Sequence, residues 1–590
     1  MALPRFRFPA ERWERMVERF HALDLSENAV LLSFAVAVGV AGALGVVLFY
    51  KLIDWSAALL FRWPAEVLPS WLEWLYRPLV TGSGLALAWY LMRRFAAGHE
   101  GLNVADVQRA VVREGGDIPA GAALTRTAAS AVTIGGGGSA GAEGPVAVFG
   151  AAIGSALGRL FRFSSARTTV LVGAGAAAGI SAAFNAPLAG AFFALEEILG
   201  SFSVSAFPPV VVASVVAAVV SRGFFGNHPA FPIPEEYGYR HAVEIIVFYP
   251  LLGLVAGLLA AFFIRSHFAM EDRIRALRIS PALRPWIGGA LVGGAVALSG
   301  GHLVGDGHLA ISLDLFGRLA WWGLVLLAVG KVLVTSLTLH AGGSGGLFTP
   351  SLYAGATIGG AFGVALAGLL PGLGLTPEAY ALVGMGAVVA AATGAPLTGI
   401  LIVFEMTDDS AIMLPLMLTV VIAYVVSRRI TPDNLYSGWL RRRGVDLEEG
   451  ADRTVMADIT VREACELVPV TIPAGDPVTR HQDLPDQDGY PVVDREGRVV
   501  GVLTLAEVRR VAREDEDSGV ARMAGEVARK VRPVVPDETL LSALRRMAAR
   551  GDSSVPVADP ATGRLFGLLS RTHAVWLYEK VMAEGRPRTP

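Results

Sequence analysis

Five consecutive residues in the first half of the chain, Gly141-Ala142-Glu143-Gly144-Pro145, combine a carboxylate with residues that start a helix. Backbone N–H groups at a helix start lack intrahelical partners, and the helix dipole makes that end attractive to anions. Glu143 is itself an anion there, so a soluble anion would compete with it. Protonation would release Glu143, and one carboxylate could then both gate a pathway and carry a proton. The alternative is a simple helix-capping glutamate, although carboxylates inside membranes are usually functional.

A matching feature in the second half, Gly346-Leu347-Phe348-Thr349-Pro350, opens a helix in the same way but contains no carboxylate. We expect the N–H groups of Leu347 and Phe348 to be available to a permeating anion. The alternative is a helix start that is simply buried in protein.

Two adjacent carboxylates, Glu196 and Glu197, end the apolar run 186–195. Neighbours on a helix point about 100° apart, so they cannot share one face. We expect one to be structural and the other to face an aqueous vestibule; the alternative places both at the membrane interface. Glu405 holds the position equivalent to Glu196 in a repeat described below, and both are interpreted as structural carboxylates that accept hydrogen bonds from loop backbone.

The composition indicates that these groups lie in a multi-pass α-helical membrane protein. Over 590 residues the chain is 53% hydrophobic and 17% charged, with a mean hydropathy of +0.51. Between Lys331 and Glu405 the only carboxylate is Glu378. Such runs are too long for the interior of a soluble domain, which excludes a soluble multidomain enzyme.

Other classes of partner and site are also disfavoured. The net charge of -2 gives no reason to expect nucleic acid. A single cysteine, Cys465, excludes a disulfide framework and a cysteine-only metal site. The apolar spans hold no metal-ligating or nucleophilic constellation, so we expect neither a metal site nor an enzyme.

Apolar segments suited to membrane helices recur along the chain, and several are shorter than the roughly 20 residues needed to cross. Glycine-rich links at 135–138 and 342–346 interrupt them. Non-helical backbone survives in lipid only where protein or a wet cavity surrounds it, so the interruptions indicate a transport site. The expected helices are 29–53, 78–96, 120–134, 145–160, 168–182, 186–199, 207–224, 243–268, 284–299, 317–339, 349–370, 378–392, 396–406 and 411–428.

An internal repeat relates the two halves. Residues 182–190 and 391–399 both carry the pattern Ala-Pro-Leu-x-Gly, each followed by a glutamate at the same spacing. Upstream, Gly150 corresponds to Gly355 in a similar run of small residues. A duplicated transporter half explains this better than chance similarity between Ala/Gly-rich helices. Hydropathy alone leaves open whether the halves are parallel or inverted.

Charge and composition set the expected boundaries. Arginines precede the first span and follow the last, so both ends are expected in the cytoplasm. We therefore predict a cytoplasmic segment 1–28, a membrane domain 29–440 and a linker 441–452. Beyond the linker, ordinary charge and two similar strand-turn-strand-helix segments predict a paired α/β module.

Residues 141–145 resemble the G-K/R-E-G-P motif of the CLC family of chloride channels and chloride/proton antiporters. Residues 346–350 are similar to its G-x-F-x-P motif, and 184–197 to its F-N-A-P-L-A-G run with paired glutamates. The resemblance covers about residues 30–445. It implies a homodimer in a lipid bilayer, with inverted repeats and one anion pathway per subunit.

Carried over by position, the resemblance implies that Glu143 is the gating glutamate and Tyr436 the central-site tyrosine. Leu347 and Phe348, together with Gly144, would bind the anion through backbone amides.

Glu197 falls on the intracellular proton glutamate that the antiporters have and the channels usually lack. The implied activity is therefore exchange of chloride, or a similar monovalent anion, for protons, with two chlorides per proton in the antiporters. The alternatives are a passive chloride channel of the same fold and, more remotely, a divalent-cation transporter regulated by a soluble domain. A bacterial inner membrane is the expected location.

Two positions depart from the family pattern. The serine of its G-S-G-I-P motif, which coordinates the central anion, aligns with Leu102, or with His99 if a short insertion is allowed. A leucine cannot donate a hydrogen bond, so nitrate or fluoride as substrate stays open. Ala142 stands in place of a basic residue, which weakens electrostatic steering at the outer mouth.

The C-terminal module resembles a pair of CBS domains, at 453–513 and 523–583, the first one shortened. Such pairs commonly bind adenine nucleotides through a serine or threonine followed three residues later by an aspartate. Here the pairs are Thr504 with Glu507 and Ser570 with His573, so a structural or dimer-stabilising role is the main alternative to a nucleotide site.

Overall fold

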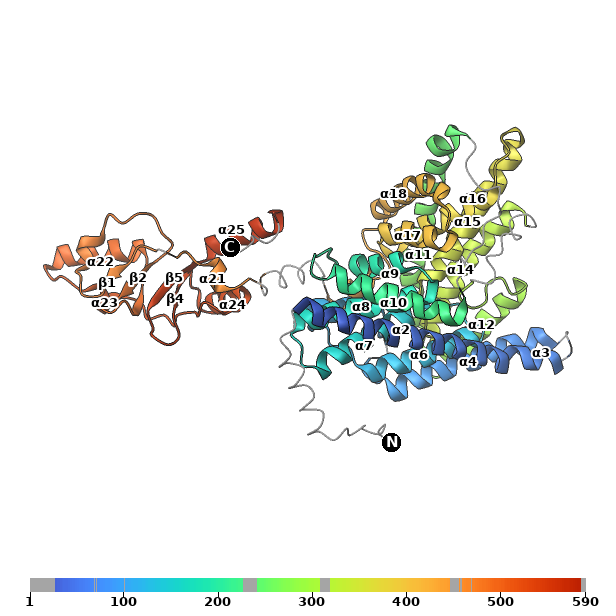
Figure 1. Ribbon diagram of the computed structural model, residues 1–590, viewed down its shortest axis with the longest axis horizontal. Coiled ribbons are helices and arrows are strands. Elements are labelled where there is room, and N and C mark those ends of the chain that lie inside the picture. Colours follow the sequence, from blue (N-terminus) through green and yellow to red (C-terminus); the bar gives the residue numbers. More distant parts are fainter. Residues whose placement is uncertain are drawn as a thin grey trace. The chain divides into compact units, whose positions relative to one another are not determined.

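The computed structural model describes residues 27–67, 69, 72–99, 101–226, 241–307, 319–445, 456, 459–467 and 469–584 (Figure 1). The chain divides into two compact units, Met1–Asp446 and Leu447–Pro590. The predicted segment 1–28 lies outside the described residues except for its last two positions, and the predicted linker is described only as far as residue 445.

The first unit is helical throughout its described part, which confirms the predicted class. Seven of the described helices are long and apolar enough to cross a membrane, while α9 and α17 span only 7 and 12 residues. Each predicted apolar span overlaps a helix, although several helices extend beyond the predicted bounds. The helices are α2 (Glu27–Ala57), α3 (Trp63–Val67), α4 (Glu73–Phe95), α5 (Val104–Arg113), α6 (Ala120–Gly135), α7 (Glu143–Leu160), α8 (Ser165–Phe184), α9 (Pro187–Phe193), α10 (Phe207–Phe225), α11 (Tyr249–Ala276), α12 (Arg284–Leu298), α14 (Trp321–Ala341), α15 (Phe348–Leu369), α16 (Pro377–Thr393), α17 (Pro396–Thr407), α18 (Met413–Ile430) and α19 (Ser437–Arg442).

Small residues allow the same close helix pair in each half. A Cβ atom built on Gly150 of α7 would collide with the carbonyl oxygen of Gly175 on α8, and the reverse also holds. Gly355 of α15 and Gly384 of α16 exclude each other's Cβ in the same way. Helices in lipid associate largely through such van der Waals contact. Because Gly355 is the repeat equivalent of Gly150, the duplication extends from the sequence to the packing.

The short helices α9 and α17 are joined by reciprocal hydrogen bonds from Glu405 and Glu196. Glu405, on α17, accepts from the first free N–H groups of α9, while Glu196, just beyond α9, accepts from those of α17. A helix start inside a membrane needs such acceptors because lipid offers none. The four donors are the backbone N–H groups of Leu188, Ala189, Leu397 and Thr398, at 2.7 to 3.1 Å.

The second unit contains two small sheets with separate apolar cores. The first sheet has the order β1-β2-β3, with β1 parallel to β2 and β2 antiparallel to β3; the second is an antiparallel pair, β4-β5. A helix follows each antiparallel pair, as predicted for the repeated module. The elements are α21 (Val461–Ala464), β1 (Ile472–Pro473), β2 (Tyr490–Val493), β3 (Val499–Leu503), α22 (Leu505–Ser518), α23 (Ala524–Val527), α24 (Leu540–Arg550), β4 (Ser554–Ala558), β5 (Leu565–Ser570) and α25 (Arg571–Glu584).

One buried ion pair closes α22 onto the following loop. Asp515 accepts hydrogen bonds from the backbone N–H of Arg522 at 2.8 Å and from its Nε at 2.6 Å. These backbone and side-chain hydrogen bonds hold the pKa of Asp515 below its usual value. The turn between α22 and α23 is therefore fixed by a carboxylate that stays charged at neutral pH.

The glycine pair predicts a position-specific sensitivity on α15. Gly355→Ala places a methyl group against the backbone of Gly384 and should destabilise the protein by about 1–3 kcal/mol, the usual effect of overpacking. Gly368→Ala is the matched control on the same helix, because a Cβ there meets nothing within 4 Å. Thermal unfolding in detergent measures both variants. Equal melting temperatures for the two would contradict the close-packing assignment.

The reciprocal carboxylates predict local effects that cross between the halves. Glu405→Gln replaces one acceptor oxygen with an NH2 group and leaves a helix-start N–H of α9 unpaired. It should lower the free energy of unfolding by about 1–3 kcal/mol. Glu196→Gln should act on α17 instead. Hydrogen exchange should show faster exchange at Leu188 and Ala189 in the first variant and at Leu397 and Thr398 in the second. Glu66→Gln, at an exposed position of α3, is the control. Faster hydrogen exchange confined to the helix that carries the mutation would refute the reciprocal arrangement.

Candidate functional site

The starts of α7 and α15, one from each half, meet inside the first unit. The loops that precede them pair through two backbone hydrogen bonds between Gly141 and Gly346, at 2.8 and 2.6 Å. α7 then begins at Glu143 and α15 at Phe348. Two sets of unpaired helix-start N–H groups therefore lie close together.

The carboxylate of Glu143 lies between these two helix starts. Glu143 is only 2% exposed, and its Oε2 accepts a hydrogen bond from the backbone N–H of Thr349 at 3.2 Å. A Cβ built on Gly141 would collide with the same oxygen, which explains the glycine there. The carboxylate thus occupies the place that the helix dipoles make favourable for an anion.

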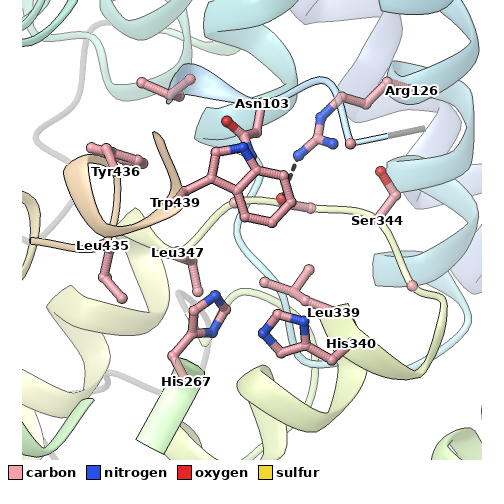
Figure 2. Close-up of a pocket in the computed structure, with 16 residues that line it drawn as sticks. Asn103, Arg126, His267, Leu339, His340, Ser344, Leu347, Leu435, Tyr436 and Trp439 are labelled. Carbon is pink, nitrogen blue, oxygen red and sulfur yellow. Dashed lines mark hydrogen bonds between the residues drawn. The ribbon is translucent and has the colours of Figure 1, made fainter. Parts of the chain in front are cut away.

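A cavity of about 130 Å³ lies next to these helix starts (Figure 2). Of the predicted anion-binding residues, Gly144, Leu347 and Tyr436 line it. Phe348 does not. Its side chain is 2% exposed and its ring packs near those of Phe184 and Phe193, at 6.0 and 6.2 Å between centroids.

The structure differs from the sequence expectation at the position of the missing serine. Leu102 and His99 line a neighbouring cavity with Asp106, not the cavity that Tyr436 lines. The N–H of Leu102 is also already bonded to the carbonyl of His99, at 3.1 Å. Asn103 lines the Tyr436 cavity instead, and its side-chain oxygen caps α5 by accepting from the N–H of Asp106. The sequence motif assigns Leu102 to the position of the missing serine because it does not encode how the chain turns before α5.

Five further residues with polar side chains line the same cavity and were not among the predicted site residues: Arg126 of α6, His267 of α11, His340 of α14, Ser344 and Trp439 of α19. Arg126 is 7% exposed and donates to the carbonyl of Gly345 at 2.9 Å. Two signals could have found part of this set. Arg126 is a charge inside a predicted membrane span, and His340 lies two residues before the glycine-rich link at 342–346.

Glu197 is buried and lies in one turn of π-helix, Ala194–Ile198. It is 7% exposed, and Gln108 Nε2 donates to both its backbone carbonyl and its Oε1, at 2.6 and 3.1 Å. Glu196, its neighbour, faces the start of α17 instead. The two adjacent carboxylates therefore have different partners.

In the second unit the four residues of the candidate nucleotide site form local hydrogen bonds at helix starts. Thr504 and Glu507 form a capping box on α22, in which the Thr504 hydroxyl also donates to Glu507 Oε2 at 2.8 Å. Ser570 Oγ accepts from the backbone N–H of His573 at 3.1 Å. The side chains of Thr504, Glu507 and Ser570 are thus engaged at their own helix starts, whereas His573 contributes its backbone N–H.

Comparison with known proteins agrees with this architecture. The family model described as voltage gated chloride channel matches residues 84–428, and the CBS domain model matches residues 453–514. A ClcB-like protein of Ralstonia nicotianae, named as a chloride channel, is 34% identical over 70% of this chain and 98% of its own length. An H(+)/Cl(-) exchange transporter ClcA of Vibrio parahaemolyticus is 30% identical over 72% of this chain and 92% of its own.

Solved structures give the same result. A slow cyanobacterial Cl-/H+ antiporter matches 71% of this chain and 99% of its own, with a TM-score of 0.62 and 27% identity. A eukaryotic CLC transporter matches 93% of this chain with a TM-score of 0.59 at 19% identity, which supports the fold alone. The chain is an integral membrane protein of the voltage gated chloride channel family, the CLC family, with a C-terminal CBS pair.

Proposed function

We propose that this protein exchanges chloride, or a similar monovalent anion, for protons across a membrane. The observation that carries the proposal is the position of Glu143. A buried carboxylate that accepts the Thr349 N–H at the meeting point of two helix starts occupies an anion's place. An anion can enter only when this carboxylate leaves, and protonation weakens its hold on the N–H donors.

Proton exchange also needs a route on the other side of the gate. Glu197 supplies a second buried carboxylate, held by Gln108 and separate from the fixed cap made by Glu196. Among the described residues Glu197 accepts from an amide donor and forms no ion pair, and such a carboxylate can take up and release a proton more readily than an ion-paired one. This favours exchange over a passive channel, and the names of the ClcA relatives and of the cyanobacterial structure support it.

Anion binding along the pathway is assigned to Tyr436, Leu347 and Gly144, which line the cavity beside the gate. The chain is further proposed to act as a homodimer in a bacterial inner membrane, with both termini in the cytoplasm. The membrane domain is proposed to span 29–440 and the CBS domains 453–513 and 523–583.

Liposome flux separates the two carboxylates. Glu143→Gln cannot carry a proton or a charge, so proton movement should fall at least ~100-fold while anion efflux continues and loses its pH dependence. Glu197→Gln should also abolish proton movement, but efflux should stay pH-dependent because Glu143 still gates. Anion efflux and lumenal pH are recorded together under a chloride gradient.

The exposed Glu66→Gln variant is the control and should behave as the parent does. Anion efflux without proton movement in the parent would refute exchange and favour a channel. An absence of anion flux under every gradient would refute both.

The CBS pair is proposed to act without adenine nucleotide, because the side chains of Thr504, Glu507 and Ser570 are already engaged at helix starts. ATP should therefore leave the melting temperature of the full-length protein unchanged, since a ligand bound only to the folded state would raise it. A rise that Glu507→Gln abolishes would contradict this and assign a nucleotide site to that cap.

A further inference from the structure

The cavity beside the gate contains buried nitrogen atoms that have no hydrogen-bond partner among the described residues. Arg126 and His267 are more than nine-tenths buried, at 7% and 3% exposure. Such atoms are rare in folded proteins, because a buried donor without an acceptor is costly. The unpartnered atoms in this cavity are Arg126 Nε, His267 Nδ1, His340 Nε2 and Trp439 Nε1.

The chemistry of these atoms calls for an acceptor. Arginine Nε and indole Nε1 can only donate hydrogen bonds, and an imidazole nitrogen donates when the ring's hydrogen is placed on it. The residues that line the cavity include Arg126 but no aspartate or glutamate. A metal ion there would be repelled by the guanidinium and would face hydrogen-bond donors that cannot coordinate it. The lining therefore suits an anion.

The donors also come from four separate helices, α6, α11, α14 and α19. The two imidazole rings lie side by side (Figure 2). Their centroids are 4.4 Å apart and their planes are at 47°. A cavity needs only about 10–15 Å³ to hold one water molecule, and this one offers about 130 Å³. A single-atom ion that contacts some of these donors leaves others unpaired. The several oxygen atoms of an oxyanion can each accept from a different donor.

We propose that this cavity binds a small planar oxyanion, such as nitrate or a short carboxylate, and that Arg126, His267, His340 and Trp439 select it over chloride. The proposal rests on the proposed function in placing the cavity on the anion pathway. Planar oxygens match N–H donors of guanidinium type better than a sphere does.

Calorimetric titration of the full-length protein in detergent tests the proposal with sodium nitrate, sodium formate and sodium chloride at constant ionic strength. In the parent we expect nitrate or formate to bind about tenfold more tightly than chloride, the difference made by one added hydrogen bond to a charged group. The nitrate and formate arms distinguish an inorganic from a carboxylate ligand. Trp439→Phe keeps an aromatic ring but removes the indole N–H. His340→Phe removes the imidazole nitrogens.

Both variants should bring the oxyanion-to-chloride ratio within about twofold of unity, while Trp286→Phe, an exposed position on α12, should keep the parent's ratio. Equal or tighter binding of chloride by the parent would overturn the proposal, and so would a ratio unchanged in both variants. Proton-coupled chloride exchange is measured separately in liposomes. Loss of oxyanion preference with intact exchange refutes this site alone, whereas oxyanion preference without exchange refutes the proposed function alone.

Discussion

The membrane unit depends on one constraint: a helix that starts inside lipid leaves backbone N–H groups that only protein, or a bound anion, can satisfy. The chain starts α7 and α15 at the same place, joined by the Gly141–Gly346 backbone pair. The carboxylate of Glu143 then accepts from the start of α15. The duplicated halves, the broken helices and the glycines around the gate all serve to bring these two helix starts together.

The same constraint is met in a permanent form at α9 and α17. There Glu405 and Glu196 each accept two backbone N–H groups from the opposite half, and Glu196 also accepts from the Thr398 hydroxyl. Glu143 has a weaker hold, with a single interhelical bond of 3.2 Å. Carboxylates of one chemical type therefore differ in role because of the number and length of their hydrogen bonds. The pair at α9 and α17 ties the halves together, whereas Glu143 at α7, the proposed gate, has fewer such bonds to break.

The local sequence predicts much of the helix placement and packing. Proline and glycine at helix starts placed α7, α9, α15 and α17 to within a few residues, because these residues act on their own backbone. The correspondence of Gly150 with Gly355 anticipated a shared packing, since close helix approach requires a missing side chain. The resemblance of short motifs indicated the family for the same reason.

What sequence could not supply was proximity between distant elements. His267 and His340 lie on α11 and α14 and meet only because those helices pack together. The chain turn before α5 directs Asn103, and not Leu102, to the cavity, and no motif encodes that turn. Loop geometry and long-range contact depend on the whole fold, so these residues were found only in the structure.

The cavity and the gate also have opposite electrostatic characters, which bears on coupling. Arg126 is a buried cation that donates to a neutral carbonyl, that of Gly345, and a desolvated charge in that state gains from a nearby anion. An anion in the cavity approaches the same helix starts that hold Glu143, and two negative charges there repel each other. Filling the cavity therefore favours either departure of Glu143 or its protonation. The basic lining of the cavity is thus the feature that would link anion occupancy to the proton on the gate.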